Sequence, residues 1–543
     1  MSQLMLIGID AASLELILKW RDKLKFFNML LEEGAYGYLR STIPPLSPAA
    51  WTSIYTGKKP SKTKFYDWLK YPTNPCNKPR VRLASSFDLK EPTIWDIATV
   101  HGLKSAIINA PLTYPSTYLR GIMVSGVPAH LFSSYPITFP LKLRKELDVL
   151  VNGYEVMPKL DILRFFEYDL VKRLELVVEK RKKAMEYLYS RENWNFFMPV
   201  FFVLDTIQHY FWSYTDENHP LYKKDSLSKV VFYFYKKIDT ILYDFIKKID
   251  DCNLIVVSDH GAGPLYGYFL VNKYLASLGL LKTKKRSMLK LLATLVFSII
   301  ELDQMFFVYE IAKRTRIPLI DKLLDKPLIK QIVERFSFFP LMELMSGDFL
   351  SEIEWNDTLA FALGAVGGIF VSKNIPKEKR RKVKMLIEKA LKNLRLPSGK
   401  KAKVELFEGY DSDNSPDFFY SIEDYKYLPI VHLSGWNNRI FEKPLFFTGW
   451  HRPLGVFFAY GPLFKKNVNG KIPVYSIYDV APTVLYALGL PALSGMDGKP
   501  IFKIFSEDAR RNLKLELKNS RQYKLARKLH LIKTKMALRN ALR

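Results

Sequence analysis

The sequence predicts an α/β fold in which helices cover both faces of a mostly parallel sheet. Short apolar runs rich in β-branched residues alternate along the chain with longer segments of helical periodicity, which is the pattern of βαβ units. These runs are apolar at nearly every position, as expected for strands that are buried on both faces. The expected strands are Leu4–Ile9, Ser105–Asn109, Met198–Leu204, Leu254–Ser258, Ala360–Val371 and Gly455–Tyr460.

Ionisable side chains stand at or near the ends of several of these runs. They are Asp10, Asp205, His209, Asp259, His260 and His451. Buried polar groups are costly unless something binds them, and open α/β sheets bind ligands at the carboxyl ends of their strands. Three Asp and three His, together with a nearby hydroxyl, suffice to hold two metal ions. Two metals beside a hydroxyl form a site for phosphoryl transfer.

The local spacing of these residues supports a shared site. Asp205 and His209 are four residues apart, so a helix starting after the third strand would turn both toward one side. Asp259 and His260 directly follow the apolar run LIVVS and precede a glycine-rich turn. His451 is expected in a glycine-flanked loop that introduces the last strand.

Ser47 stands at the head of an expected helix over Ala49–Tyr55, within PPLSPAAWTSIYTG. Serine at the N-cap followed by Pro48 at N1 is an ordinary helix start. A helix N-terminus also favours a phosphate, and a metal-bound hydroxyl becomes a nucleophile more easily. Because Pro48 has no N–H, the metals or the amides of Ala49 and Ala50 would have to stabilise the developing negative charge.

We expect one catalytic domain over residues 1–505, interrupted by two helical insertions. The first insertion spans about 139–191 and is highly charged, and the second spans about 282–350 and combines basic clusters with apolar stretches. The last helix of the domain is expected over Tyr478–Gly489, with the glycine as its C-cap. Residues 506–543 form a separate tail.

The tail is basic and amphipathic. From Arg510 to Arg543 it carries twelve Lys or Arg and a single acid, Glu516. Its apolar residues on one helical face are Leu525, Leu529, Ile532 and Met536. Such a segment can contact a membrane or nucleic acid peripherally, or it can pack on its own domain as a solvated helix.

The net charge of +28 favours anionic substrates, nucleic acid or anionic membrane surfaces. A lysine-rich proteome or a hot habitat would produce the same bias. The longest uncharged apolar stretch near the middle, Leu291–Ile300, is too short for a transmembrane helix. We interpret the N-terminus as a first strand and not as a signal peptide. With only two cysteines, the sequence predicts a cytoplasmic protein without disulfides.

The order and spacing of the motifs resemble the alkaline phosphatase superfamily. The similarity is greatest to its type I phosphodiesterase/nucleotide pyrophosphatase branch, in the form found in many archaeal and bacterial phosphohydrolase-like proteins. It covers roughly residues 1–130, 195–280 and 350–500, and it implies a three-layer α/β/α sandwich. The motifs are GID at Asp10, IPPLSPAAWTSIYTGKKPSK around Ser47, DTIQH at Asp205, SDHGAG at Asp259 and WHRPLGVFFAYGP at His451.

This resemblance implies a hydrolase that uses two metal ions and a phosphoserine intermediate formed on Ser47. It implies one metal held by Asp205, His209 and His451, and another held by Asp10, Asp259, His260 and the Ser47 oxygen. Oxygen and imidazole donors suit Zn²⁺, with Mn²⁺ as an alternative. The implied substrate is an anionic phosphate ester, either a phosphodiester or a pyrophosphate.

Two motifs of this chain differ from those of the nucleotide pyrophosphatases. Those enzymes often place Asn three residues after the nucleophile, where this chain has Ala50, and Lys-His-Gly where it has Lys62-Thr63-Lys64. The departures weigh against nucleotide specificity more than against hydrolysis. Lys62 is a candidate to bring positive charge to the phosphate.

Two alternative functions remain open on the sequence. A phosphomutase like the cofactor-independent phosphoglycerate mutases needs the same seven ligands but returns the phosphoryl group to its substrate. A non-enzymatic alternative is a basic adaptor on a phosphatase-like scaffold that binds membranes or nucleic acid. A sulfatase is disfavoured because Ser47 is followed by Pro-Ala-Ala-Trp and not by the x-Pro-x-Arg continuation of sulfatases.

Overall fold

The computed structural model describes most of the chain. The described residues are 3–70, 82–129, 136–158, 167–284, 350, 352–410, 415–431, 439–444, 447–466 and 471–542. The expected insertion at about 282–350 therefore lies almost entirely outside them. No helix within the described ranges is long and apolar enough to cross a bilayer.

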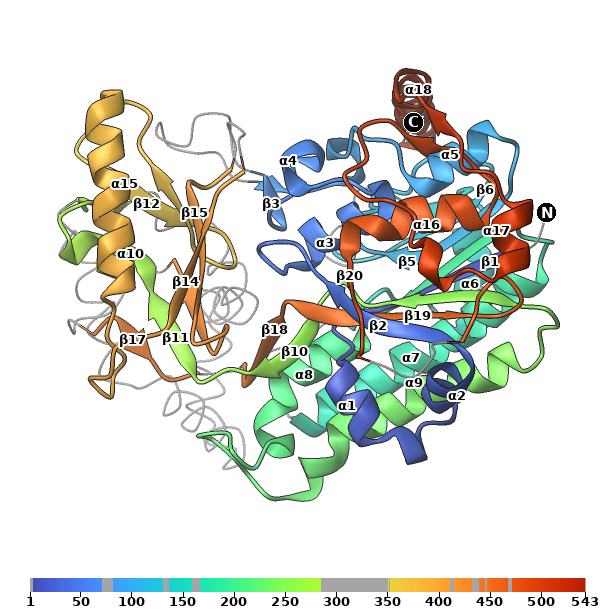
Figure 1. Cartoon of the computed structure of the whole chain (residues 1–543), viewed down its shortest axis with the longest axis horizontal. Coiled ribbons are helices and arrows are strands. Elements are labelled where there is room, and N and C mark those ends of the chain that lie inside the picture. Colours follow the sequence, from blue (N-terminus) through green and yellow to red (C-terminus); the bar gives the residue numbers. More distant parts are fainter. Residues whose placement is uncertain are drawn as a thin grey trace, which may run out of the picture.

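A nine-stranded sheet forms the centre of the main lobe (Figure 1). In chain order its strands are β1 (Leu4–Ile9), β2 (Ala35–Arg40), β5 (Ser105–Ala110), β6 (Gly121–Ser125), β7 (Thr138–Phe139), β8 (Phe196–Phe201), β9 (Asn253–Val257), β19 (Leu454–Tyr460) and β20 (Val474–Ser476). Their order across the sheet is β20-β2-β19-β9-β1-β8-β5-β6-β7. The stretch from β9 to β6 is parallel, whereas β19 and β7 run antiparallel to their neighbours. The predicted mostly parallel sheet is confirmed.

Helices cover both faces of this sheet. Along β1, Met5, Ile7 and Ile9 join one apolar cluster and Leu4 and Leu6 join the other, because successive side chains of a strand point to opposite faces. The helices of the first cluster are α1 (Leu14–Lys19), α2 (Lys25–Glu33), α6 (Leu143–Val151), α7 (Glu167–Ser190), α8 (Val203–Thr215) and α9 (Val230–Ile246). Those of the second are α3 (Ser47–Thr56), α5 (Ile94–Val100) and α16 (Val480–Ala487). The result is the predicted three-layer α/β/α sandwich.

The segment expected as a first insertion, about 139–191, contains α6 and α7. Both are helical, as predicted, and their apolar residues Leu147 and Leu174 belong to the core of the main lobe. The tail contains α17 (Glu507–Asn512) and α18 (Arg521–Leu542). Ala509 and Tyr523 from these helices join the second apolar cluster, so the tail packs on the main lobe.

A second sheet of seven strands forms the second lobe, at the left of Figure 1. Its strands are β11 (Gly267–Leu270), β12 (Ala360–Leu363), β13 (Gly368–Val371), β14 (Val404–Glu408), β15 (Phe418–Ile422), β16 (Tyr427–Ile430) and β17 (Phe441–Glu442). Helices α10 (Val271–Ser277) and α15 (Lys377–Lys392) pack against it around a separate apolar cluster. The prediction of one strand over Ala360–Val371 in the main sheet is wrong. Turn residues split that run into the antiparallel hairpin β12–β13 of this second sheet.

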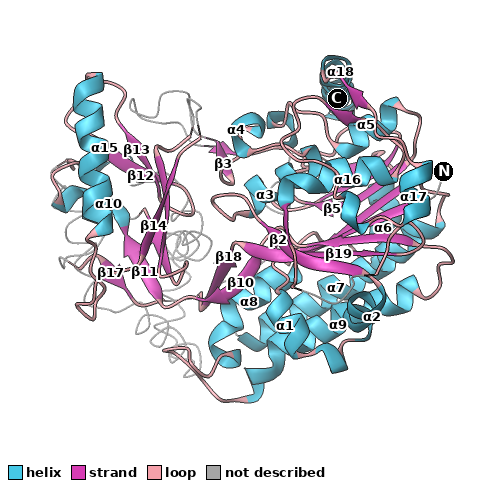
Figure 2. Ribbon diagram, in the orientation of Figure 1, coloured by secondary structure: helices cyan, strands magenta, loops and turns pink. Residues whose placement is uncertain are grey.

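A two-stranded ribbon links the lobes (Figure 2). It pairs β10 (Gly261–Pro264) with β18 (Gly449–Arg452) in antiparallel register. Along the chain, β10 follows β9 and leads into β11, whereas β18 follows β17 and leads into β19. The chain therefore enters the second lobe along one strand of the ribbon and returns along the other.

Short elements complete the described structure. They are α4 (Pro60–Thr63), the pairs β3 (Leu69–Lys70) with β4 (Arg82–Leu83) and β21 (Ala492–Leu493) with β22 (Leu517–Lys518), and 3₁₀ turns at Arg21–Lys23, Ser86–Asp88, Ser226–Lys229, Ile477–Asp479 and Phe502–Ile504.

Candidate metal centre

Three neighbouring strands carry three carboxylates to one edge of the main sheet. Strands β9, β1 and β8 lie side by side and parallel, and Asp259, Asp10 and Asp205 follow their carboxyl ends. The possible ligand atoms of Asp10, Asp259 and His260 all lie within 4.8 Å of one another. The same holds for Asp205, His260 and His451. The sheet therefore gathers side chains that are far apart in the sequence.

Helix α8 and the ribbon add two further imidazoles. Strand β8 ends at Phe201, earlier than the predicted Met198–Leu204, so Asp205 lies in the first turn of α8. The Asp205 Oδ1 atom is 3.2 Å from His209 Nε2 and 3.3 Å from His451 Nε2. The two Nε2 atoms are 3.1 Å apart. Asp205, His209 and His451 thus form a compact group, as the i, i+4 spacing of the first two predicts.

His451 lies in a strand, and the prediction of a loop is wrong. It sits in β18 opposite Ala262 of β10. Its ring stacks on that of His260, with the centroids 3.8 Å apart and 21° between the planes. Pairing with β10 fixes the backbone of His451 next to the segment that carries Asp259 and His260.

Ser47 is the first residue of α3, and not the N-cap that the sequence predicts. Leu46 occupies the cap position and Pro48 follows within the first turn. The Ser47 side chain is buried, and its Oγ lies 3.3 Å from His260 Nε2. The amide of Ala50 donates to the Leu46 carbonyl at 2.9 Å. Of the two amides expected to face a phosphate, that of Ala50 is therefore already used.

Backbone carbonyls set the tautomer of all three imidazoles. The Nδ1 atoms of His209, His260 and His451 lie 2.9, 3.0 and 2.8 Å from the carbonyl oxygens of Gly449, Gly261 and Pro45, respectively. A carbonyl oxygen only accepts hydrogen bonds, so each Nδ1 carries the hydrogen. In the neutral ring the Nε2 lone pair then faces the centre, as in histidines that bind metals.

Several ligand atoms in the centre have no hydrogen-bond partner. Asp10 Oδ1, Asp205 Oδ1 and Asp259 Oδ2 are buried and unsatisfied among the described residues. Buried unpaired carboxylate oxygens are strongly unfavourable. The Nε2 lone pairs of His209 and His451 would also repel each other at 3.1 Å unless a proton or a cation lay between them. The donor set therefore fits metal ions.

Burial and neighbouring charges shift the pKa values of the three carboxylates in the centre. Burial, and then the charges of Asp259 and Asp205, hold the pKa of Asp10 well above its usual range. Burial and the Asp205 charge do the same to the pKa of Asp259. Burial alone would raise the pKa of Asp205, but His209 and His451 outweigh it and the pKa falls well below its usual range. Asp205 is thus the carboxylate that is most readily ionised.

The pKa values of the three imidazoles also shift in different directions. Burial, and then the neighbouring His451, lower the pKa of His260 well below its usual value. Burial also lowers the pKa of His451. The pKa of His209 is raised, because the Asp205 carboxylate outweighs the effect of burial. Two of the imidazoles are therefore neutral near pH 7, and His209 most readily holds a proton.

The family-model comparison decides the family of this chain. Residues 4–314, more than half of the 543, match the model for type I phosphodiesterase / nucleotide pyrophosphatase. The chain belongs to this family. It is therefore a metal-dependent hydrolase of phosphodiester or pyrophosphate bonds. Of the eight predicted site residues, Lys62 included, only His451 lies beyond the matched segment.

Solved structures of low similarity include murine ectonucleotide pyrophosphatase / phosphodiesterase 5, at 12% identity and a TM-score of 0.48, covering 93% of this chain and 100% of that one. The same murine protein, inactive and in complex with AMP, has 12% identity and a TM-score of 0.49 over the same shares. The human counterpart has 13% identity and a TM-score of 0.45, covering 92% of this chain and 98% of that one. A search of curated proteins finds no match.

Trp51 is a site residue of this phosphodiesterase-family protein that the sequence did not predict. It contacts one of the carboxylates of the centre. Its Nε1 donates to Asp10 Oδ2 at 2.7 Å, which orients the carboxylate and leaves Oδ1 for a ligand. A Cβ on Gly8 would lie 2.5 Å from the Trp51 ring, so the indole fits only over a glycine. The sequence did contain a signal for this role, because Trp51 follows Ser47 by four residues and therefore lies on the same face of the helix.

Lys62 makes contacts outside the centre. Its Nζ lies 2.7 Å from Asp497 Oδ1 and donates to the Gly495 carbonyl at 2.9 Å. The side chain is 42% exposed. Its positive charge is thus already partnered, and the expectation that it meets the substrate stays a prediction.

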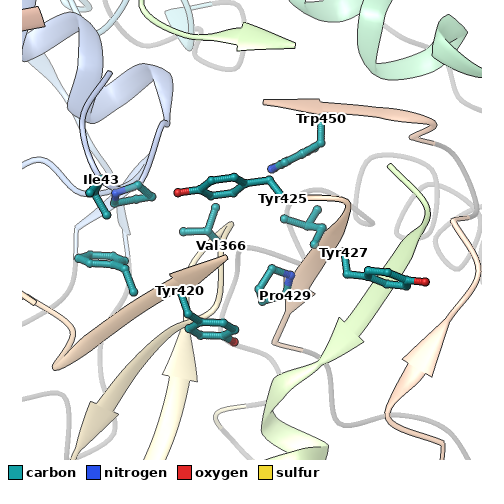
Figure 3. A pocket seen from close by; sticks show the side chains of 10 residues that line it. Ile43, Val366, Tyr420, Tyr425, Tyr427, Pro429 and Trp450 are labelled. Carbon is teal, nitrogen blue, oxygen red and sulfur yellow. The ribbon is translucent and has the colours of Figure 1, made fainter. Parts of the chain in front are cut away.

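An aromatic pocket opens beside the centre (Figure 3). Trp450 lines it and stacks on His451, with the ring centroids 4.7 Å apart. Tyr425 and Val366 of the second lobe face Ile43 of the main lobe across it. Among the described residues, those that line the pocket include no acidic or basic side chain, so it does not suit a phosphate.

Proposed function

We propose that this chain cleaves phosphodiesters or pyrophosphates by attack of Ser47 Oγ on phosphorus at a centre of two divalent metal ions. Zn²⁺ is the first candidate and Mn²⁺ the second, because the donors are carboxylates and imidazoles. The ligand sets proposed are Asp205, His209 and His451 for one ion, and Asp10, Asp259, His260 and Ser47 for the other.

The observation that carries this proposal is the convergence of unsatisfied donors around one hydroxyl. Within the described part of the chain, three buried carboxylate oxygens lack hydrogen-bond partners, and three imidazoles turn their Nε2 atoms toward them. Ser47 Oγ lies at their edge, 3.3 Å from His260 Nε2. When bound, divalent ions would ease loss of the Ser47 proton and offset the negative charge of the phosphate.

The chain's own groups then determine the course of the reaction. Ser47 begins the ten-residue helix α3, whose N-terminal dipole favours an anionic phosphate beside the hydroxyl. Attack forms the Ser47 Oγ–P bond, breaks the bond from phosphorus to the leaving oxygen and produces a phosphoserine. Water then displaces Ser47 from phosphorus and restores the hydroxyl. The Trp51 hydrogen bond holds Asp10 in place through both steps.

Replacement of the nucleophile tests the mechanism. We expect Ser47→Ala to lower kcat on bis-p-nitrophenyl phosphate by about 10³-fold or more, measured with Zn²⁺ and with Mn²⁺. The matched control is Ser53→Ala. This residue lies on the same helix, and its buried Oγ has no partner among the described residues, so the control should keep its activity.

The outcome distinguishes the alternatives. Undiminished cleavage by Ser47→Ala would contradict the nucleophile, and wild-type inactivity with every metal would contradict the hydrolase. The same assay on p-nitrophenyl phosphate compares monoester with diester cleavage. A phosphomutase would transfer the phosphoryl group between alcohols without net release of phosphate. Net release dependent on Ser47 would therefore argue against it.

A further inference from the structure

The C-terminal helix α18 exposes its apolar stripe. The stripe residues Leu525, Leu529, Ile532 and Met536 are 58%, 49%, 44% and 61% exposed. The side of α18 that faces the main lobe carries a mixed set of residues, namely Tyr523, Arg527, His530, Leu531, Thr534 and Leu538. At 100° per residue the two sets lie on opposite sides of the helix. A surface helix normally turns its apolar stripe toward the core, and α18 turns it away.

Buried polar contacts hold α18 in this orientation. The Asp96 carboxylate of α5 lies 2.8 Å from His530 Nδ1 and 3.4 Å from an Arg527 nitrogen. The Tyr118 amide donates to Thr534 Oγ1 at 2.9 Å. Rotating the helix to bury the stripe would remove Arg527 and His530 from the buried Asp96 carboxylate and leave it only its hydrogen bonds from Thr93, which is costly. The outward direction of the stripe is therefore fixed by the fold.

Basic side chains flank the stripe. Arg521, Lys528 and Arg539 are exposed, and their spacing of seven and eleven residues aligns them along one side of it. Other lysines lie nearer the main lobe: Lys524 pairs with Glu91, and Lys533 lies over the Tyr118 ring. Helix α18 itself contains no acidic residue. The outer face thus combines aliphatic groups with positive charge.

We propose that the outer face of α18 docks this protein on an anionic lipid bilayer. The four stripe residues would enter the headgroup region, and Arg521, Lys528 and Arg539 would contact lipid phosphates. Nucleic acid would use the charges but not the four aliphatic side chains. A second copy of the chain docked on this face would place its own positive charges against those of the first copy, and the two sets would repel each other. An anionic membrane matches both the aliphatic stripe and the positive charge. Figure 1 places α18 at the edge of the molecule, beside α5.

Vesicle co-sedimentation of the full chain tests this proposal. We expect the wild type to bind vesicles containing phosphatidylglycerol and to bind phosphatidylcholine vesicles weakly. Changing Leu525, Leu529, Ile532 and Met536 to Gln should reduce binding by about tenfold or more. Changing Arg521, Lys528 and Arg539 to Gln should reduce it by roughly fivefold per charge.

The matched control changes Met385 and Leu386 to Gln on the basic helix α15, where both residues are 60% and 43% exposed. It should bind vesicles like the wild type. Equal binding by the stripe variant, or no binding of the wild type to anionic vesicles, would overturn the proposal. So would a dimer in sedimentation velocity that only the stripe variant loses, which would identify a second copy as the occupant. Circular dichroism melts check that each variant is folded.

Discussion

At the scale of single residues, the metal centre depends on where each imidazole holds its hydrogen. Main-chain carbonyls at Gly449, Gly261 and Pro45 fix the Nδ1–H of the three histidines. A side-chain acceptor could be lost by mutation, but these acceptors belong to the backbone. The ligating direction of the rings is thus a property of the fold.

Metal binding should release protons. Without metal, burial and neighbouring charges raise the pKa of Asp10 and Asp259, and Asp205 raises the pKa of His209. All three groups must lose their protons to bind an ion. A raised pKa means that the proton is held to higher pH, so metal affinity should weaken as pH falls through those raised values. Zinc titration in weak buffer with a pH indicator measures the release.

The variant His209→Gln isolates one of these protons. It should release fewer protons than the wild type near neutral pH, and His219→Gln serves as the control because His219 bonds the Leu265 carbonyl outside the centre. Metal affinity that is unchanged or tighter at lower pH would contradict this account.

At this scale the sequence was most informative. Asp10, Asp205, Asp259 and His260 follow strands whose apolar runs are plain. Ser47 lies at the start of a helix, although as its first residue and not as the predicted N-cap. What the sequence could not reveal were the partners that orient them. A backbone carbonyl has no residue-type signal, so the role of Pro45 or Gly449 appears only in three dimensions.

At the scale of elements, the β10–β18 ribbon positions both His451 and the acceptor for His209. Gly449 begins β18 next to α8, and a Cβ there would overlap the carbonyl oxygen of Gln208. The close approach of strand to helix is what sets the 3.1 Å separation of the two Nε2 atoms. The glycine therefore controls the geometry of one proposed metal site.

The substitution Gly449→Ala should separate β18 from α8. We expect about a 10- to 100-fold loss of metal affinity and a loss of about 1–3 kcal/mol in the free energy of unfolding. Metal titration and urea unfolding measure the two effects. Gly368→Ala in β13 of the second lobe is the control, because its Cβ would crowd the Pro416 side chain and should lower stability without weakening metal binding. Equal effects of both substitutions would contradict this role.

Elements of the main sheet were predictable where they are long and buried on both faces, as in β1 and β19. The second lobe was not. Its strands β11, β12 and β13 have four residues each, and a run of four apolar residues fits a strand or a helix equally well. The hairpin of β12 and β13 therefore looked like one continuous strand.

At the scale of the whole molecule, bound metal should contribute to stability. The main sheet folds against three buried carboxylates, each with one oxygen that has no hydrogen-bond partner among the described residues. Ions that bind only the folded state add about 2.7 kcal/mol at a concentration of about 100 times Kd.

Chelation should accordingly lower the melting temperature. Calorimetry with EDTA and after addition of Zn²⁺ measures the shift. The variant Asp10→Asn, which weakens the site, should show a smaller shift than the wild type. An identical melt with and without chelator would contradict a resident metal.

The position of β19 has a consequence for synthesis of the chain on the ribosome. This strand, Leu454–Tyr460, lies between β2 and β9 in the middle of the sheet. Until it emerges, a nascent chain holding β9 and β1 has an open, apolar edge beside Val256, and such edges invite association with other chains. The main sheet can therefore close only after residue 460 has been synthesised, and a chain stopped before residue 454 should expose the edge of β9.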